Sequence, residues 1–228
     1  MKDQIEHIFF DLDHTLWDFE KNSALAFKKI FEERELALDL DDFLHVYVPL
    51  NLKFWRMFRE NRLTKTELRY IRLRSAFDEL KYPCNDLLIK EIANDYLTYL
   101  PTFNHLFKET GTILSYLDQT YKLHIITNGF ANVQEGKLVN SGIDHYFKVV
   151  VNSEMAGVKK PNPYIFKLAM KRAGARPERS LMIGDSFEAD VLGALNAGMH
   201  ALYFNPEGET VPGHIQSIGN LLEIKKLL

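Results

Sequence analysis

Two aspartates directly follow a strongly apolar run near the start of the sequence. Residues 8–10 are Ile-Phe-Phe, Asp11 comes next, and Asp13 follows two positions later. The apolar stretch 5–10 is typical of a central parallel strand that is covered on both faces. Ligands of open α/β sheets bind beyond the carboxyl ends of such strands. Two carboxylates at one strand end repel each other unless a positive charge joins them, so the pair indicates a divalent cation site.

Further polar residues stand at the ends of later apolar runs or in the loops that follow them. Taken alone, each is typical of a turn or a helix cap, because Asp and Asn favour both positions. Taken together, they supply a hydroxyl, an amide, a lysine and a second carboxylate pair, which predicts one shared site at the edge of a sheet. These residues are Thr127, Asn128, Lys160, Asp185 and Asp190.

The elements that must position these residues form two kinds of segment. From residue 101 onward, short apolar runs alternate with amphipathic stretches, which predicts βαβ units and an α/β fold with a parallel sheet. Residues 17–100 show helical periodicity and capping signals but no convincing strand. We therefore predict a core of residues 1–16 and 101–228, and an inserted all-helical domain of residues 17–100.

Some local features of these elements can also be predicted. Thr64 and Glu67 have the spacing of a capping box, which predicts a helix start. Asp41 and Asp42 are the expected N-caps of an earlier helix. Residues 218–228 are expected to form a closing helix.

Composition limits the possible partners. The 228 residues carry a formal net charge of −3, which argues against a nucleic-acid polymer as partner and favours a small molecule. The single cysteine excludes an internal disulfide, and no apolar run approaches the length that crosses a bilayer. No basic-then-apolar leader precedes Asp11. We expect a cytoplasmic protein with no membrane partner, as a monomer or small homo-oligomer.

The motifs and their order resemble those of the haloacid dehalogenase-like superfamily, the metal-dependent phosphohydrolases with an aspartate nucleophile. Residues 11–15 (Asp-Leu-Asp-His-Thr) match the first motif, Thr127 the second, Lys160 the third, and 184–190 the fourth. The resemblance covers the whole chain. It implies a Rossmann-like core, and it implies that the helical insert is a mobile cap.

Phosphoryl transfer gives a physical reason for each of these residue types. Asp11 is the expected nucleophile, because a carboxylate that attacks phosphorus splits hydrolysis into two easier steps. Asp13 is the expected general acid, then base. Thr127 and Lys160 are expected to bind the phosphoryl oxygens, where negative charge accumulates, and Asn128 is a further substrate-binding candidate.

The predicted cofactor is Mg²⁺, which prefers hard oxygen ligands in octahedral geometry. We expect the side chains of Asp11 and Asp185 as ligands, and the resemblance implies the backbone carbonyl of Asp13 as a third. Asp190 is expected behind these ligands, where it would orient Lys160 or a metal-bound water.

Several functions remain open within this chemistry. Asp13 favours a phosphomonoesterase over a dehalogenase, because only the former has a leaving alkoxide to protonate. Residues 15–19 and 158–166 resemble the pyrimidine 5'-nucleotidases, which implies a nucleoside monophosphate as substrate. A sugar-phosphate or phosphoglycolate phosphatase is the main alternative, and phosphonatase or mutase activity stays open. A phosphate-binding module without turnover is the non-enzymatic alternative.

Two features of the predicted insert have both a structural and a functional interpretation. Tyr47, Asn51, Phe54 and Phe58 lie at helical spacing; they could stack a nucleobase, but such stripes are usually core. Six arginines could attract phosphate, but the ordinary interpretation is a solvated helix face. These arginines are Arg56, Arg59, Arg62, Arg69, Arg72 and Arg74.

Overall fold

The chain folds into two compact units. The computed structural model describes residues 4–228. One unit comprises residues 1–19 and 104–228, and the other comprises residues 20–103. Among the described residues, no helix is both long enough and apolar enough to span a bilayer. The assignment of these units as catalytic core and cap stays a prediction.

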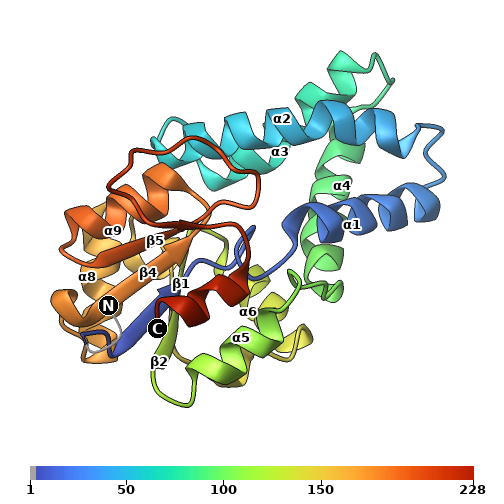
Figure 1. Cartoon of the computed structure of the whole chain (residues 1–228). Helices are drawn as coiled ribbons and strands as arrows, with labels where there is room; N and C mark the ends of the chain where they lie inside the picture. The colour runs from blue at the N-terminus through green and yellow to red at the C-terminus, as the bar shows by residue number, and fades with distance from the viewer. Residues whose placement is uncertain (1–3) are drawn as a thin grey trace. The chain divides into compact units, whose positions relative to one another are not determined.

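A six-stranded parallel sheet forms the centre of the first unit (Figure 1). Its strand order is β3-β2-β1-β4-β5-β6, so β1 pairs with β2 on one side and with β4 on the other. All four residues of β1 are buried, as expected for a central strand. The strands are β1 (His7–Phe10), β2 (Lys122–Thr127), β3 (Phe147–Asn152), β4 (Ser180–Gly184), β5 (His200–Phe204) and β6 (Ser217–Ile218).

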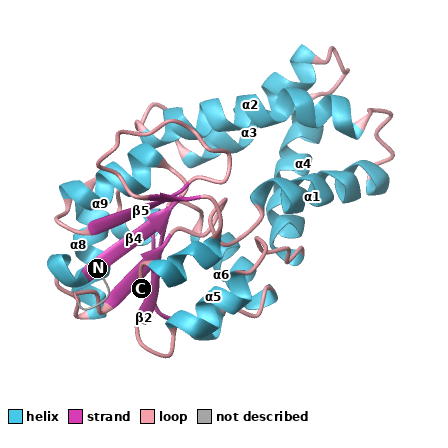
Figure 2. Ribbon diagram, viewed as in Figure 1, coloured by secondary structure: helices cyan, strands magenta, loops and turns pink. Residues whose placement is uncertain are grey.

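Helices cover both faces of this sheet, so the predicted α/β fold is confirmed. α8 (Pro163–Ala173) and α9 (Gly193–Asn196) lie on one side, and α5 (Thr110–Leu117) and α6 (Ala131–Asn140) lie on the other (Figure 2). On the α8 side, Phe9, Met182 and Phe166 belong to one buried apolar cluster. Shorter helices are α7 (Ser153–Ala156), η2 (Asp144–Tyr146), η3 (Pro177–Arg179), η4 (Phe187–Leu192) and η5 (Leu221–Lys226).

The second unit is helical throughout and has an aromatic core. Phe27 packs with ring centroids 4.8 Å from Phe43, 4.6 Å from Tyr47 and 4.6 Å from Tyr96. Its helices are α1 (Phe19–Glu33, whose first residue belongs to the first unit), α2 (Leu40–Arg59), α3 (Lys65–Glu79), α4 (Asp86–Tyr99) and η1 (Leu100–Thr102). Four side chains at helical spacing in α2 are buried, which favours a role in the core of this unit over stacking on a nucleobase. They are Tyr47, Asn51, Phe54 and Phe58.

One of the six arginines does not lie on a solvated face. Arg72 is only 2% exposed, and its guanidinium donates to Asn51 Oδ1 at 3.1 Å. The guanidinium carbon also lies 4.9 Å from the ring centroid of Tyr96, which gives a cation–π contact. The expectation of a solvated face is therefore wrong for Arg72, because Asn51 and the tyrosine ring stabilise its burial.

Two local predictions also need correction. α2 is capped by Asp39, which accepts from the backbone N–H of Asp42, so the predicted caps lie inside the first turn. The predicted closing helix is interrupted because Ile218 pairs with Phe204 in the sheet. A shorter helix, η5, starts only after Asn220, which caps it. The capping box of Thr64 and Glu67 is present as predicted.

Candidate active site

A buried lysine lies between two carboxylates at the carboxyl edge of the sheet. The Nζ of Lys160 lies 2.7 Å from Asp11 Oδ1 and 2.6 Å from Asp190 Oδ1. It also donates to the backbone carbonyl of Ile126 at 2.7 Å. An ammonium has three protons, and three acceptors surround this one. The lysine is 2% exposed, so solvent screens its charge very little.

Strand pairing explains why residues so distant in sequence meet here. Phe10 of β1 pairs with Ile183 of β4, and the N–H of Asp11 donates to the carbonyl of Ile183 at 2.9 Å. Asp11 and Asp185 therefore leave adjacent strands at the same edge. Thr15 Oγ1 donates to Asp185 Oδ1 at 3.1 Å and accepts from the Asp185 N–H at 3.1 Å, which holds this second carboxylate.

Asp190 reaches the site because Gly184 leaves room for it. A Cβ on Gly184 would lie 2.3 Å from Asp190 Oδ2 and 2.4 Å from its Cγ. Asp190 stands in η4, a wide π-type helix turn, and its Oδ2 accepts from the Ser186 N–H at 3.0 Å. The carboxylate is thus fixed from two sides against Lys160.

The charges of this cluster call for a further cation. Ligand oxygens of Asp11, Asp185 and Asp190 all lie within 4.8 Å of one another. Burial is the main reason that the pKa of Asp11 is raised to about 7; Lys160 opposes the rise, and repulsion from Asp190 adds to it. Burial and the charges of Asp11 and Asp190 likewise raise the pKa of Asp185 well above its usual value. Burial alone would lower the pKa of Lys160, but the two aspartates raise it.

The oxygen donors of this cluster fit a magnesium ion. Three carboxylates face one ammonium group, so negative charge remains when all are ionised. Lys160 and the Ser186 N–H hold both oxygens of Asp190, whereas Lys160 holds Oδ1 of Asp11 and Thr15 holds Oδ1 of Asp185. Asp11 and Asp185 are therefore the more available ligands. Hard oxygen donors of this kind suit Mg²⁺, which usually keeps several waters.

Thr127 and Asn128 end β2 beside this cluster, and their side chains have different surroundings. Asn128 Oδ1 accepts from the N–H of Lys160 at 2.7 Å, and its Nδ2 donates to the Lys160 carbonyl at 3.1 Å. Asn128 therefore holds the loop that carries the lysine. Thr127 Oγ1 accepts from the Gly129 N–H at 3.1 Å and from Gln134 Nε2 at 2.7 Å.

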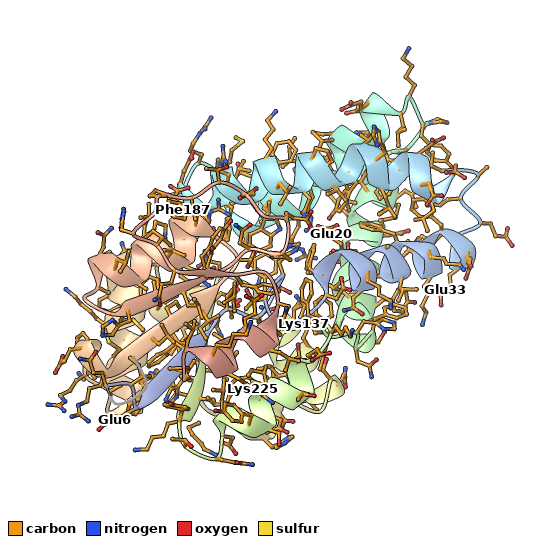
Figure 3. All side chains as sticks on the ribbon, viewed as in Figure 1. Glu6, Glu20, Glu33, Lys137, Phe187 and Lys225 are labelled. Atoms are coloured by element: carbon orange, nitrogen blue, oxygen red, sulfur yellow. The ribbon has the colours of Figure 1, made fainter. Side chains whose placement is uncertain are left out.

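Two residues of α6 contact Asp13, and the sequence reasoning missed both. Lys137 Nζ lies 2.6 Å from Asp13 Oδ1, and Gln134 Nε2 donates to Asp13 Oδ2 at 3.0 Å. Lys137 is labelled in Figure 3. Both residues are buried and stand three apart, on one face of the helix that follows Thr127. The sequence feature that could have identified them is the presence of polar side chains on the inward face of that helix.

The comparison with known families agrees with this geometry. A model of haloacid dehalogenase-like hydrolases matches residues 5–198. The chain belongs to the haloacid dehalogenase-like hydrolase family. It is therefore a hydrolase, and the resemblance inferred from the motifs is confirmed.

Two similar proteins within this family are named for small phosphorylated substrates. The hydrolase is 33% identical over 204 residues to pyrimidine 5'-nucleotidase PynA of Streptococcus pneumoniae, covering 87% of this chain and 83% of that protein. It is 31% identical over 217 residues to glyceraldehyde 3-phosphate phosphatase of Methanothermobacter thermautotrophicus, covering 94% and 92%. Its fold matches a magnesium-bound structure of the putative hydrolase YfnB of Bacillus subtilis at a TM-score of 0.89, with 29% identity and 98% coverage of both chains.

Proposed function

We propose that this hydrolase is a Mg²⁺-dependent phosphomonoesterase that acts on nucleoside 5'-monophosphates through an aspartyl-phosphate intermediate. The observation that carries the proposal is the buried cluster in which Lys160 bridges Asp11 and Asp190 beside Asp185. It combines a carboxylate nucleophile with a fixed cation and a candidate metal site. Such an arrangement suits an anionic phosphoryl group.

The reaction needs two proton transfers and two substitutions at phosphorus. Asp11 attacks phosphorus, the bond to the substrate oxygen breaks, and the carboxyl group of Asp13 gives its proton to the leaving alkoxide. Asp13 then removes a proton from water, which attacks the same phosphorus and releases phosphate and the Asp11 carboxylate. Lys160 and the hydroxyl of Thr127 stabilise the phosphoryl oxygens in both steps.

The side chains of Asp11 and Asp185, with the backbone carbonyl of Asp13, would hold the magnesium ion. When bound, the ion supplies positive charge that offsets the repulsion between the phosphoryl group and the carboxylates. Asp190 keeps Lys160 in place through the contact at 2.6 Å. The helical unit, residues 20–103, is proposed as the cap.

The choice of substrate rests on similarity. The resemblance of residues 15–19 and 158–166 to pyrimidine 5'-nucleotidases agrees with the 33% identity to PynA. The similarity to a glyceraldehyde 3-phosphate phosphatase supports a sugar phosphate as the second candidate. Asp13 supports either substrate class over a halogenated acid, which has no alkoxide to protonate.

A substrate panel with two aspartate variants tests the proposal. Purified enzyme is assayed for phosphate release from p-nitrophenyl phosphate, from UMP, dUMP and dTMP, and from sugar phosphates. We expect Asp11→Asn to lose about a thousandfold or more of kcat, because no nucleophile remains. Asp144→Asn is the matched control, since Asp144 is exposed in the same unit. Chelation should abolish turnover, and added Mg²⁺ should restore it.

Each part of the proposal would be contradicted by a different experimental result. Activity retained by Asp11→Asn would exclude the covalent mechanism. Turnover that survives exhaustive chelation would exclude the magnesium requirement. If the pyrimidine monophosphates are no better than the sugar phosphates, the nucleotidase assignment fails while the phosphatase assignment stands.

A further inference from the structure

The carboxylate of Asp13 is held by a separate donor at each oxygen. Lys137 Nζ lies 2.6 Å from Oδ1, and Gln134 Nε2 lies 3.0 Å from Oδ2. Both donors come from α6 and are nearly inaccessible, at 2% exposure for Lys137 and 1% for Gln134. Two donors on two oxygens restrict rotation of the carboxylate.

Gln134 also joins Asp13 to the phosphate-binding candidate Thr127. Its Nε2 lies 2.7 Å from Thr127 Oγ1 as well as 3.0 Å from Asp13 Oδ2. Thr127 Oγ1 accepts a second hydrogen bond from the Gly129 N–H at 3.1 Å. A hydroxyl oxygen has two lone pairs, so the proton of Thr127 is left to be donated elsewhere.

The surroundings of Lys137 make its position well defined. Its Nζ lies 4.3 Å from the ring centroid of Trp17 and 5.3 Å from that of Phe19, within cation–π range. A buried ion pair adds little net stability, because desolvation of both charges offsets their attraction. The pair of Lys137 and Asp13 is therefore better explained by what it does to Asp13 than by stability.

We propose that Gln134 and Lys137 are positioning residues that hold the Asp13 carboxylate as the base for the breakdown of the aspartyl phosphate. The inference rests on the proposed function. In that step a proton passes from water to Asp13, the water oxygen bonds to phosphorus, and the bond from phosphorus to Asp11 breaks. Gln134 additionally orients Thr127, so that its hydroxyl donates to the phosphoryl group.

The assignment predicts a separation of the two chemical steps. p-Nitrophenolate is a good leaving group and needs little protonation, so Asp11 can still be phosphorylated when Asp13 is misplaced. The second step still needs the base. In Lys137→Met we expect kcat for p-nitrophenyl phosphate to fall about tenfold to a hundredfold, while kcat/KM changes by less than about threefold. Gln134→Met should show the same fall in kcat with a smaller fall in kcat/KM, because Thr127 also loses the donor that orients it in the first step.

Rapid mixing should make this separation visible. Both variants should release a burst of p-nitrophenolate that approaches one equivalent per active site, followed by slow turnover. Asp13→Asn should give the same burst and a slower steady state. Damage to the fold alone would lower the burst amplitude and kcat/KM together with kcat.

Three further variants separate positioning from loss of folding. A Cβ on Gly129 would lie 2.4 Å from Gln134 Cδ, so Gly129→Ala should displace the amide and give the Gln134→Met pattern without removing a buried charge. Lys137→Arg keeps the charge and should recover part of kcat. Lys148→Met is the matched control, because the side chain of Lys148 is 55% exposed on β3.

The results distinguish this inference from the function on which it rests. Equal losses of kcat and kcat/KM without a burst, or unchanged kinetics in Lys137→Met and Gly129→Ala, would overturn the positioning role. Activity that survives in Asp11→Asn would instead overturn the aspartyl-phosphate mechanism. A burst in the α6 variants together with an inactive Asp11→Asn supports both.

Discussion

A buried pair of histidines should make the sheet sensitive to acid. His7 Nδ1 lies 3.0 Å from His124 Nε2, so one ring nitrogen donates and the other must accept with an unprotonated lone pair. Both side chains are nearly inaccessible, at 3% and 1% exposure. Burial, the neighbouring charge of His7 and that of Lys122 lower the pKa of His124 to about 3. Burial also lowers the pKa of His7.

The sign and size of the effect follow from proton linkage. As the pH falls below about 6.5, the unfolded chain takes up a proton at His124 that the folded chain does not bind, so acid favours unfolding. With a folded pKa of about 3, His124 alone should cost about 2 kcal/mol at pH 5 relative to neutral pH. The loss should level off only below about pH 3, and His7 should add to it in the same direction.

Urea unfolding at pH 7.5, 6 and 5 measures this loss. Replacing Trp55, which lies in the helical unit, by Phe leaves Trp17 as the fluorescent reporter of the unit that contains the sheet. We expect His124→Phe to lose about 2 kcal/mol less than the parent protein between pH 7.5 and pH 5. His214→Asn, at an exposed position, is the matched control and should follow the parent.

Comparing the parent protein with His124→Phe cancels the effect that other titratable groups have on the free energy of unfolding. The carboxylates of Asp11 and Asp185 also have different pKa values in the folded and the unfolded state, but they are present in both proteins. Only the difference between parent and variant reports on His124. If the two proteins lose the same free energy of unfolding on acidification, then His124 is protonated while buried and the reasoning is wrong.

Two further predictions concern single positions. Gly184→Ala should displace Asp190, because the new Cβ would lie 2.3 Å from Asp190 Oδ2, and kcat should fall at least about tenfold. Gly111→Ala is the control and should retain activity, because a Cβ at Gly111 would meet open space. Thr64→Ala should cost about 1 kcal/mol of free energy of unfolding of the helical unit, measured by urea titration, because the helix loses its cap. Thr66→Ala, in the first turn of the same helix, should cost much less.

Much of the site could be predicted because strand periodicity acts over short distances in sequence. An apolar run of four to six residues followed by a polar group is visible without any partner, and parallel pairing then brings the carboxyl ends of β1, β2 and β4 to one edge. That rule alone places Asp11 beside Asp185. The motif order then restricts which polar residues belong together.

The partners of individual side chains could not be predicted in the same way. The substrate-binding role of Asn128 stays a prediction, but the sequence does not indicate that both groups of its amide bind the backbone of Lys160, which is 32 residues away. Arg72 looked like part of a solvated face, yet it is buried against Tyr96. In both cases the outcome depends on which distant backbone or ring lies within about 3 to 5 Å, and helical spacing contains no such information.

The contacts of Asp13 show how a helix can add to a proposed catalytic motif that is visible in the sequence. Asp13 is recognisable from its distance to Asp11, but its two donors appear only when α6 packs beside it. Gln134 and Lys137 occupy positions where apolar side chains would stabilise the packing at lower desolvation cost. A helix that instead buries an amide and an ammonium against one carboxylate gains little stability from them. The proposed function supplies the reason, because a base is effective only when its carboxylate is held in the orientation in which it meets the attacking water.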